Sequence, residues 1–381
     1  MEAYFDNSAT TPVYPEVRDL MVKIMEEDYG NPSSLHMKGV TAARYIKDAR
    51  ESLAGEMKVM SKEIVFTSGG TESNNMALIG GALANRRAGN KIITTSVEHA
   101  SVGSPMDFLA DMGFDIVRIG VDSSGQIDMD QLMSEVDDDT IIVSVMYVNN
   151  EIGTVMPIAD IARLIKEKNP NVLFHVDAIQ AFGKYRIYPK RMGIDMMSIS
   201  GHKFHGPKGV GALFIRDRVK VKPIIYGGGQ QSGMRSGTEN VPGIAGMALA
   251  AEITYNGLEE KMEHLRQIKE HLISELTQID DVYSNSGDAP HIASITFKGV
   301  RSEVMLHALE EREVYVSSGS ACSSNKQHAS GTLKAIGLPQ DKLESTLRFS
   351  FSPENTMEQV DYAVECCRQL LPVLRRYVRK K

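Results

Sequence analysis

Val172-Leu-Phe-His-Val-Asp177 is an apolar run that ends in an acid, and it decides the fold. Its β-branched and aromatic residues favour a strand, and a helical pattern over residues 158–168 comes before it. The same alternation of helix and short apolar strand runs through the first two thirds of the chain. Further strands are predicted over residues 63–67, 91–95, 115–119, 140–146 and 195–199, and further helices over 16–27, 72–86 and 241–276.

This alternation predicts an α/β fold with a mainly parallel sheet covered by helices. The run at residues 209–215 follows the preceding strand closely, so we expect it to join the same sheet as an antiparallel seventh strand. Beyond residue 256 a charged helix, a strand over 292–297 and helices over 303–311 and from 357 onward indicate a smaller α+β domain. We therefore predict a large domain of residues 15–255 and a small domain of residues 1–14 and 256–381.

Composition narrows the class of protein. The chain has 381 residues, of which 42% are hydrophobic, and this is enough for two hydrophobic cores. Its net charge is -7 and its basic residues are scattered, which excludes the basic surface of a nucleic-acid-binding protein. Three cysteines, Cys322, Cys366 and Cys367, are too few and too awkwardly spaced for a disulfide framework. No signal peptide or membrane-spanning run is present in the sequence, so we expect a cytoplasmic protein.

Three segments carry candidate chemistry. Ser68-Gly-Gly-Thr-Glu-Ser73 stands between a strand and a helix, where backbone N–H groups favour an anion, although such a turn is more often only a helix cap. Asp177 ends a strand, where open α/β sheets bind ligands, or it caps the following turn. Lys203 leaves the next strand into a glycine-rich turn, either as a surface lysine or as a Schiff-base amine.

Together these three segments match the needs of pyridoxal phosphate: an anion site, a carboxylate for the ring nitrogen and a lysine for the aldehyde. A dinucleotide fits less well, because the glycine-rich residues 206–211 lead into a strand rather than a helix. A zinc site formed by His202 and His205 with His175 or Cys322 is disfavoured by the lack of any CxxC or HExxH spacing, and no metal is predicted.

Two further residues remain open on composition alone. His99 follows a strand end, where it is either an ordinary loop histidine or a ring that lies over a planar cofactor. Cys322 is flanked by serines and a glycine, which favours a reactive thiol over a buried core residue. Cys366 and Cys367 have apolar helical neighbours and are interpreted as inert.

These segments resemble a known family, the group I cysteine desulfurases of NifS/IscS type, which are class V aminotransferase-like pyridoxal-phosphate enzymes of fold type I. The resemblance covers almost the whole chain, and the SSGSAC form favours group I over group II. The matching segments, in the family's order, are YFDNSATTP (4–12), GNPSSLH (30–36), IVFTSGGTESNN (64–75), TSVEHASV (95–102), YVNNEIGT (147–154), HVDAIQ (175–180), SISGHKFHGPKG (198–209), GGGQQSGMRSGTENV (227–241), SSGSACSS (317–324) and LRFSFS (347–352).

The resemblance implies a role for each matching residue. Lys203 would form the Schiff base with pyridoxal 5'-phosphate, Asp177 would pair with the ring nitrogen, and His99 would stack on the ring and shuttle protons. Asn150 would contact the cofactor and, with Arg348, the substrate carboxylate. The residues implied around the phosphate and phenolate are Gly70, Thr71, Gln180, Ser200 and His202, together with Thr238, which would reach the phosphate of a neighbouring subunit in a homodimer.

The implied reaction converts L-cysteine to L-alanine and leaves the sulfur on Cys322 as a persulfide. A protein acceptor, such as an iron-sulfur scaffold or a tRNA-thiolation enzyme, would then receive the sulfur. A selenocysteine lyase or an aminotransferase on the same fold is the alternative, and an assembly subunit without activity is the non-enzymatic one. Cys322 and the reaction products discriminate among them.

Overall fold

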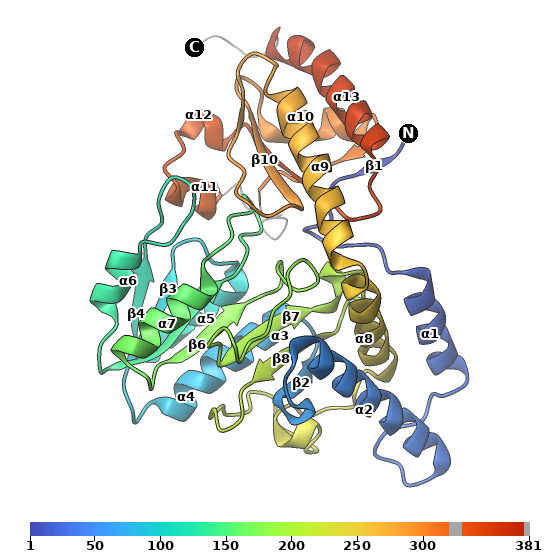
Figure 1. The fold of residues 1–381 in the computed structure, drawn as a ribbon, viewed down its shortest axis with the longest axis vertical. Coiled ribbons are helices and arrows are strands. Elements are labelled where there is room, and N and C mark those ends of the chain that lie inside the picture. The colour runs from blue at the N-terminus through green and yellow to red at the C-terminus, as the bar shows by residue number, and fades with distance from the viewer. Residues whose placement is uncertain (320–329, 377–381) are drawn as a thin grey trace.

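The computed structural model describes residues 1–319 and 330–376, and a seven-stranded sheet forms the centre of its lower half (Figure 1). Six strands run parallel, and β8 is antiparallel to both of its neighbours. The predicted seven-stranded, mainly parallel sheet with an antiparallel last strand is therefore confirmed. In spatial order its strands are β2 (Ile64–Thr67), β8 (Gly211–Ile215), β7 (Met196–Ser200), β6 (Leu173–Asp177), β5 (Thr140–Met146), β3 (Lys91–Thr95) and β4 (Asp115–Ile119).

Both faces of this sheet are buried, which explains the continuous apolar runs in the sequence. All seven residues of β5 are buried. Val143 and Val145 belong to the main core, together with Ile161 on a covering helix. Ile142 belongs to a separate cluster with Met106, on another helix. Successive residues of β5 therefore pack into different cores, as the alternation of side chains along a strand requires.

Helices cover the sheet and lead into the upper half of the molecule (Figure 1). Those of the lower half are α1 (Pro15–Glu26), α2 (Met37–Met57), α3 (Gly70–Asn75), α4 (Gly81–Asn85), α5 (Ala100–Asp111), α6 (Met129–Glu135), α7 (Ile158–Lys168) and α8 (Val241–Tyr255). Those that continue upward or lie in the upper half are α9 (Leu258–Leu276), α10 (Ser302–Glu310), α11 (Gly331–Ala335), α12 (Gln340–Leu343) and α13 (Met357–Arg376).

The prediction of one helix over residues 241–276 is wrong. The helix stops at Tyr255, and a new helix, α9, begins at Leu258. Gly257 between them has φ 65°, a left-handed conformation that ends a helix and that glycine adopts without steric cost. The break lets α8 pack against α1 and α2 while α9 crosses into the upper half (Figure 1).

The upper half contains a three-stranded antiparallel sheet and a short parallel pair. Strand β10 (Ile292–Phe297) lies between β9 (Val282–Ser284) and β12 (Thr346–Ser350). Strand β1 (Ala3–Tyr4) pairs with β11 (Val314–Tyr315), so the N-terminal arm lies against the C-terminal region. The division into domains at residues 14 and 255 stays a prediction.

In the described part of the chain no helix is long and apolar enough to cross a membrane. Cys366 and Cys367 are buried on α13, as their apolar neighbours suggest. Burial raises the pKa of the Cys367 thiol, which keeps it protonated and unreactive at neutral pH.

Candidate active site

A cavity of about 200 Å³ lies at the carboxyl ends of the parallel strands. This is the edge at which open α/β sheets bind ligands. Thr238 is exposed and does not line the cavity, and Cys322 lies outside the described residues. The cavity brings together ten predicted site residues from distant parts of the sequence: Gly70, Thr71, His99, Asn150, Asp177, Gln180, Ser200, His202, Lys203 and Arg348.

Lys203 occupies the short 3-10 turn that follows β7. Its Nζ donates to the main-chain carbonyl oxygens of Ser8, at 2.6 Å, and Ala9, at 2.8 Å. Gln180 donates from Nε2 to the same carbonyl of Ser8, at 3.0 Å. The N-terminal arm thus forms one wall of the cavity and fixes the direction of the lysine side chain.

Asp177 is the last residue of β6 and is buried. Its Oδ1 accepts from the backbone N–H of Ile179, at 3.0 Å, and its Oδ2 accepts from Nδ2 of Asn74, at 2.8 Å. Burial raises the pKa of Asp177, and these two donors together with His99 and Lys203 act against that effect. A cation bound next to this carboxylate would favour its charged form further.

His99 caps the N-terminus of α5, and the hydrogen bonds fix its tautomer. Its Nδ1 accepts from the backbone N–H of Ser101, at 3.1 Å, so in the neutral ring the proton is on Nε2. The Ser101 hydroxyl lies 2.8 Å from the same Nδ1 and accepts from Asn74 Nδ2, at 2.9 Å. Burial lowers the pKa of His99, which keeps the ring neutral at neutral pH. Asn74 therefore links Asp177 to His99.

Gly70 begins a helical run that continues to Asn85. A Cβ atom at position 70 would lie 2.2 Å from Cδ1 of Ile179 and 2.9 Å from its Cγ1, so a larger residue would force Ile179 to move in the cavity that both residues line. The Oγ of Ser8, which also lines the cavity, is buried without a hydrogen-bond partner in the described structure. Space and an unsatisfied polar atom are both features of a ligand site.

Arg348 on β12 brings the upper half into the site and is only 4% exposed. Its Nη1 donates to the main-chain carbonyl of Asn150, at 2.8 Å, and its Nη2 pairs with Oδ1 of Asp6, at 2.8 Å. Nε has no hydrogen-bond partner among the described residues. A guanidinium has five N–H groups, so donors remain for an anionic ligand.

Several residues of the site were not predicted from the sequence. Asp6, Asn74 and Ser101 hold the predicted residues, and their only signal was their position inside the quoted segments. Glu98 is a further one: its Oε1 accepts from Thr95 and from the backbone of Met146, and burial raises its pKa to about 8. Within the described ranges, no group of three or more His, Cys, Asp or Glu side chains is arranged to hold a metal ion.

Comparison with known proteins places this chain in a family. The model of the family described as aminotransferase class V matches residues 3–363. The chain is 41% identical over 375 residues to cysteine desulfurase IscS of Methanosarcina thermophila, covering 98% of this chain and 92% of that protein. It is 42% identical over 365 residues to a NifS/IcsS protein homolog of Lactobacillus delbrueckii subsp. bulgaricus, covering 94% of each.

Solved structures agree with the sequence relatives. A NifS-like protein superposes with a TM-score of 0.93 at 38% identity, covering 98% of this chain and 100% of that one. The structure titled SspA in complex with cysteine gives a TM-score of 0.81 at 36% identity, over 93% of this chain and 100% of that one. The chain therefore belongs to the aminotransferase class V family, among its NifS- and IscS-like cysteine desulfurases.

Proposed function

We propose that this protein is a cysteine desulfurase that binds pyridoxal 5'-phosphate in the cavity and converts L-cysteine to L-alanine. The observation that carries the proposal is the convergence of a lysine, a strand-end aspartate, a neutral histidine and an arginine on one cavity. Each has a separate task in amino-acid chemistry on this cofactor. The family relatives that are named cysteine desulfurases support the same assignment.

The residues of the cavity fit the cofactor. Gly70 leaves room at the start of a helical run, where backbone N–H groups suit a phosphate, and Thr71, Gln180, Ser200 and His202 supply polar atoms around it. Asp177 supplies the carboxylate for a protonated ring nitrogen, and Lys203 supplies the amine for the aldehyde. When bound, pyridoxal phosphate provides a ring that takes up the electron pair left after a bond to the substrate α-carbon is broken.

Lys203 and His99 handle protons in this proposal. The Lys203 amine would take the α-proton of the substrate, and its direction is set by the carbonyls of Ser8 and Ala9. The neutral His99 ring carries its proton on Nε2, because Nδ1 accepts a hydrogen bond from the backbone N–H of Ser101. In this state it donates a hydrogen bond, and it becomes a base only after giving up that proton.

Arg348 and Asn150 are the proposed carboxylate site. The guanidinium is buried and planar, which suits two parallel hydrogen bonds to a carboxylate. Asn150 lines the same cavity, and its main-chain carbonyl orients the arginine. Binding the carboxylate there would orient the rest of the amino acid toward Lys203.

Cys322 is the proposed sulfur acceptor, on the strength of its sequence context and the family resemblance. Its thiolate attacks the sulfur of L-cysteine, so that a sulfur–sulfur bond forms and the carbon–sulfur bond breaks. The carbon keeps the electron pair and takes up a proton, which gives alanine and a persulfide on the enzyme. No external oxidant is required, because the electron pair of the carbon–sulfur bond stays on the carbon, which is reduced as the sulfur is oxidised.

A homodimer is also proposed, with Thr238 reaching the phosphate of the neighbouring site. Thr238 is exposed, and the segment that carries it is held to α2 by a 2.9 Å hydrogen bond from Arg50 to Gln231. The corner between α1 and α2 exposes large apolar side chains, including Leu35 at 99% and Met37 at 75%, which is typical of a protein interface. A cytoplasmic location, and an iron-sulfur scaffold or a tRNA-thiolation enzyme as sulfur acceptor, complete the proposal.

The test is incubation of the purified protein with L-cysteine, pyridoxal phosphate and a reductant, followed by assay of alanine and sulfide. Equal amounts of both are expected. A parallel incubation without the reductant, which would remove a persulfide, should show one added sulfur on the peptide that contains Cys322 and none on the buried Cys366 and Cys367. Lys203→Ala should abolish both products, and Cys322→Ala should abolish the persulfide. A keto acid in place of alanine would indicate an aminotransferase and overturn the proposal.

A further inference from the structure

Lys184 is a buried lysine to which the proposed reaction gives no task. It lies in the turn after β6 and is 6% exposed. Its Nζ donates to the main-chain carbonyl of Lys203, at 3.2 Å. In the described part of the chain, no carboxylate oxygen lies within 4.0 Å of this Nζ, which is the distance limit for an ion pair. A buried cation without a counter-charge costs stability, so stability does not explain this residue.

The groups that face Lys184 cannot balance its charge. They are Lys203 and His205 in the turn after β7 and His291 beside β10. Burial lowers the pKa of His205 to about 4 and that of His291 well below its usual value, and the charge of Lys184 adds to both effects. Both histidines are therefore neutral at neutral pH. The positive charge of Lys184 remains uncompensated on this side of Lys203.

The Lys184 amine loses its charge at a pH only slightly above neutral. Burial, and secondly the charge of Lys203, lower the pKa of Lys184 to about 8. The amine is thus mostly an ammonium at pH 7 and neutral well above pH 8. Its hydrogen bond to the Lys203 carbonyl needs only a donor and survives in both states.

We propose that Lys184 is a positioning residue for Lys203, which it holds by the main-chain carbonyl while adding a positive charge beside the reacting amine. This charge favours the uncharged form of whatever group Lys203 carries, and Asp177 in the cavity wall opposes it. Among the described residues that line the cavity with Lys203, the other ionisable groups are His99, His202 and Arg348. The two histidine rings are neutral at neutral pH, and the arginine is paired with Asp6. Only the identity of the group on Lys203 rests on the proposed function.

The experiment is a pH titration of the visible absorbance of the protein loaded with pyridoxal phosphate. Lys184→Met and Lys184→Gln remove the charge, and Gln keeps a donor for the Lys203 carbonyl. In both, the midpoint should rise by about one pH unit, the size expected for one unit charge at a partly buried site. Lys184→Arg keeps the charge and should keep the parental midpoint, which guards against variants that fail to fold.

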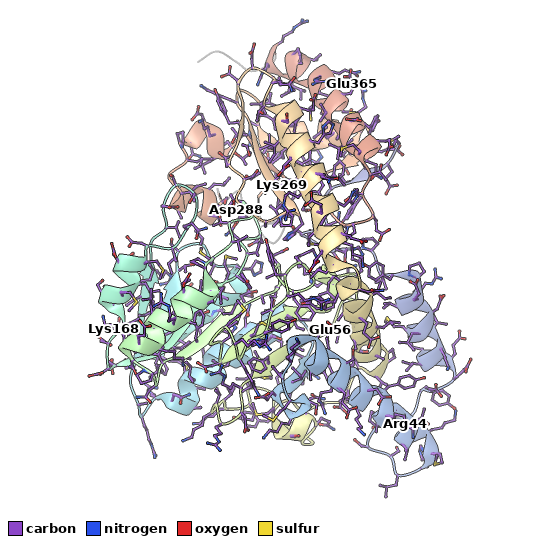
Figure 2. All side chains as sticks on the ribbon, in the orientation of Figure 1. Arg44, Glu56, Lys168, Lys269, Asp288 and Glu365 are labelled. Carbon is purple, nitrogen blue, oxygen red and sulfur yellow. The ribbon has the colours of Figure 1, made fainter. Side chains whose placement is uncertain are left out.

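Lys269→Met is the matched control. Lys269 is equally buried, at 7% exposed, and burial lowers its pKa to about 8. It donates to the carbonyls of Gly287 and Ala289, beside the labelled Asp288 in Figure 2, and it does not line the cavity. Its replacement by Met should leave the midpoint unchanged.

If Lys184→Gln keeps the parental midpoint of the absorbance titration, the inference is overturned, even where the midpoint of Lys184→Met has shifted. A fall in melting temperature without any change in the midpoint would also overturn it, because that is the result of a structural role alone. Failure of the proposed function gives a different result: the unaltered protein would show no visible band after addition of pyridoxal phosphate.

Discussion

Arg348 on β12 and Asp6 in the N-terminal arm form an ion pair with 2.8 Å between Nη2 and Oδ1, although 342 residues separate them in the sequence. The pair connects the strand that carries the arginine to the arm that also contacts Lys203. Asp6 cannot be the partner of the substrate carboxylate, since both are anions. Its task is to orient the guanidinium.

Asp6→Ala should therefore weaken substrate binding and leave the chemical step intact. Without its acceptor the guanidinium loses one of its two fixed contacts, and we expect KM for L-cysteine to rise about tenfold, equivalent to about 1.4 kcal/mol, with little change in kcat. Asp6→Asn keeps an acceptor oxygen and should stay close to the parental KM. Steady-state kinetics check this, and a parental KM for Asp6→Ala would show that the pair does not orient Arg348.

Gly70→Ala should lower the affinity for pyridoxal phosphate about tenfold, because the new Cβ pushes Ile179 into the cavity. Titration of the cofactor-free protein with pyridoxal phosphate, followed by visible absorbance, measures the change. The double variant Gly70→Ala with Ile179→Ala removes the clash and should recover affinity. Gly55→Ala, on α2 with open space around its Cβ, is the control and should bind as the parent does.

The inner strands of the large sheet were predictable because each is a short apolar run buried on both faces. The helix over residues 37–57 was not predicted, because several of its buried positions are small residues such as Ala42 and Ala49, which give little hydrophobic contrast in a sequence. The break at Gly257 was missed because a single glycine also occurs inside helices.

Candidate site residues at strand ends, such as Asp177 and Ser200, were predictable because the sheet fixes where they lie. Their partners were not. Asn74 reaches Asp177 across 103 residues, and no local periodicity encodes such a contact. Lys184 was also beyond prediction, because its importance depends on burial and on the lack of a nearby carboxylate in the described structure.

Asn74→Ala should reduce kcat about tenfold or more, since the lost hydrogen bond to a carboxylate is worth about 1.5–3 kcal/mol. Asp177 would lose one of two N–H donors, so its pKa would rise further and its hold on a protonated ring would weaken. His99 would also lose the support that reaches it through Ser101. Asn75→Ala is the control, because it removes only an exposed hydrogen bond to Thr71. An equal decrease of kcat in both variants would contradict the role of Asn74.

Buried histidines should make the protein sensitive to mild acid. Burial lowers the pKa of His175 to about 3 and those of His202 and His205 to about 4, all below the value of 6.5 expected in the unfolded chain. Between pH 6.5 and about 4, these histidines are protonated in the unfolded chain and remain neutral in the folded chain. The free energy of unfolding, which is at its full value above pH 6.5, therefore decreases as the pH falls. Each such histidine adds a slope of about 1.4 kcal/mol per pH unit. Urea unfolding at several pH values measures this slope. His175→Gln keeps polar atoms near Ser144 and Ser198 and should reduce the slope of the free energy of unfolding against pH by about 1.4 kcal/mol per pH unit. An unchanged slope would mean that His175 does not resist protonation.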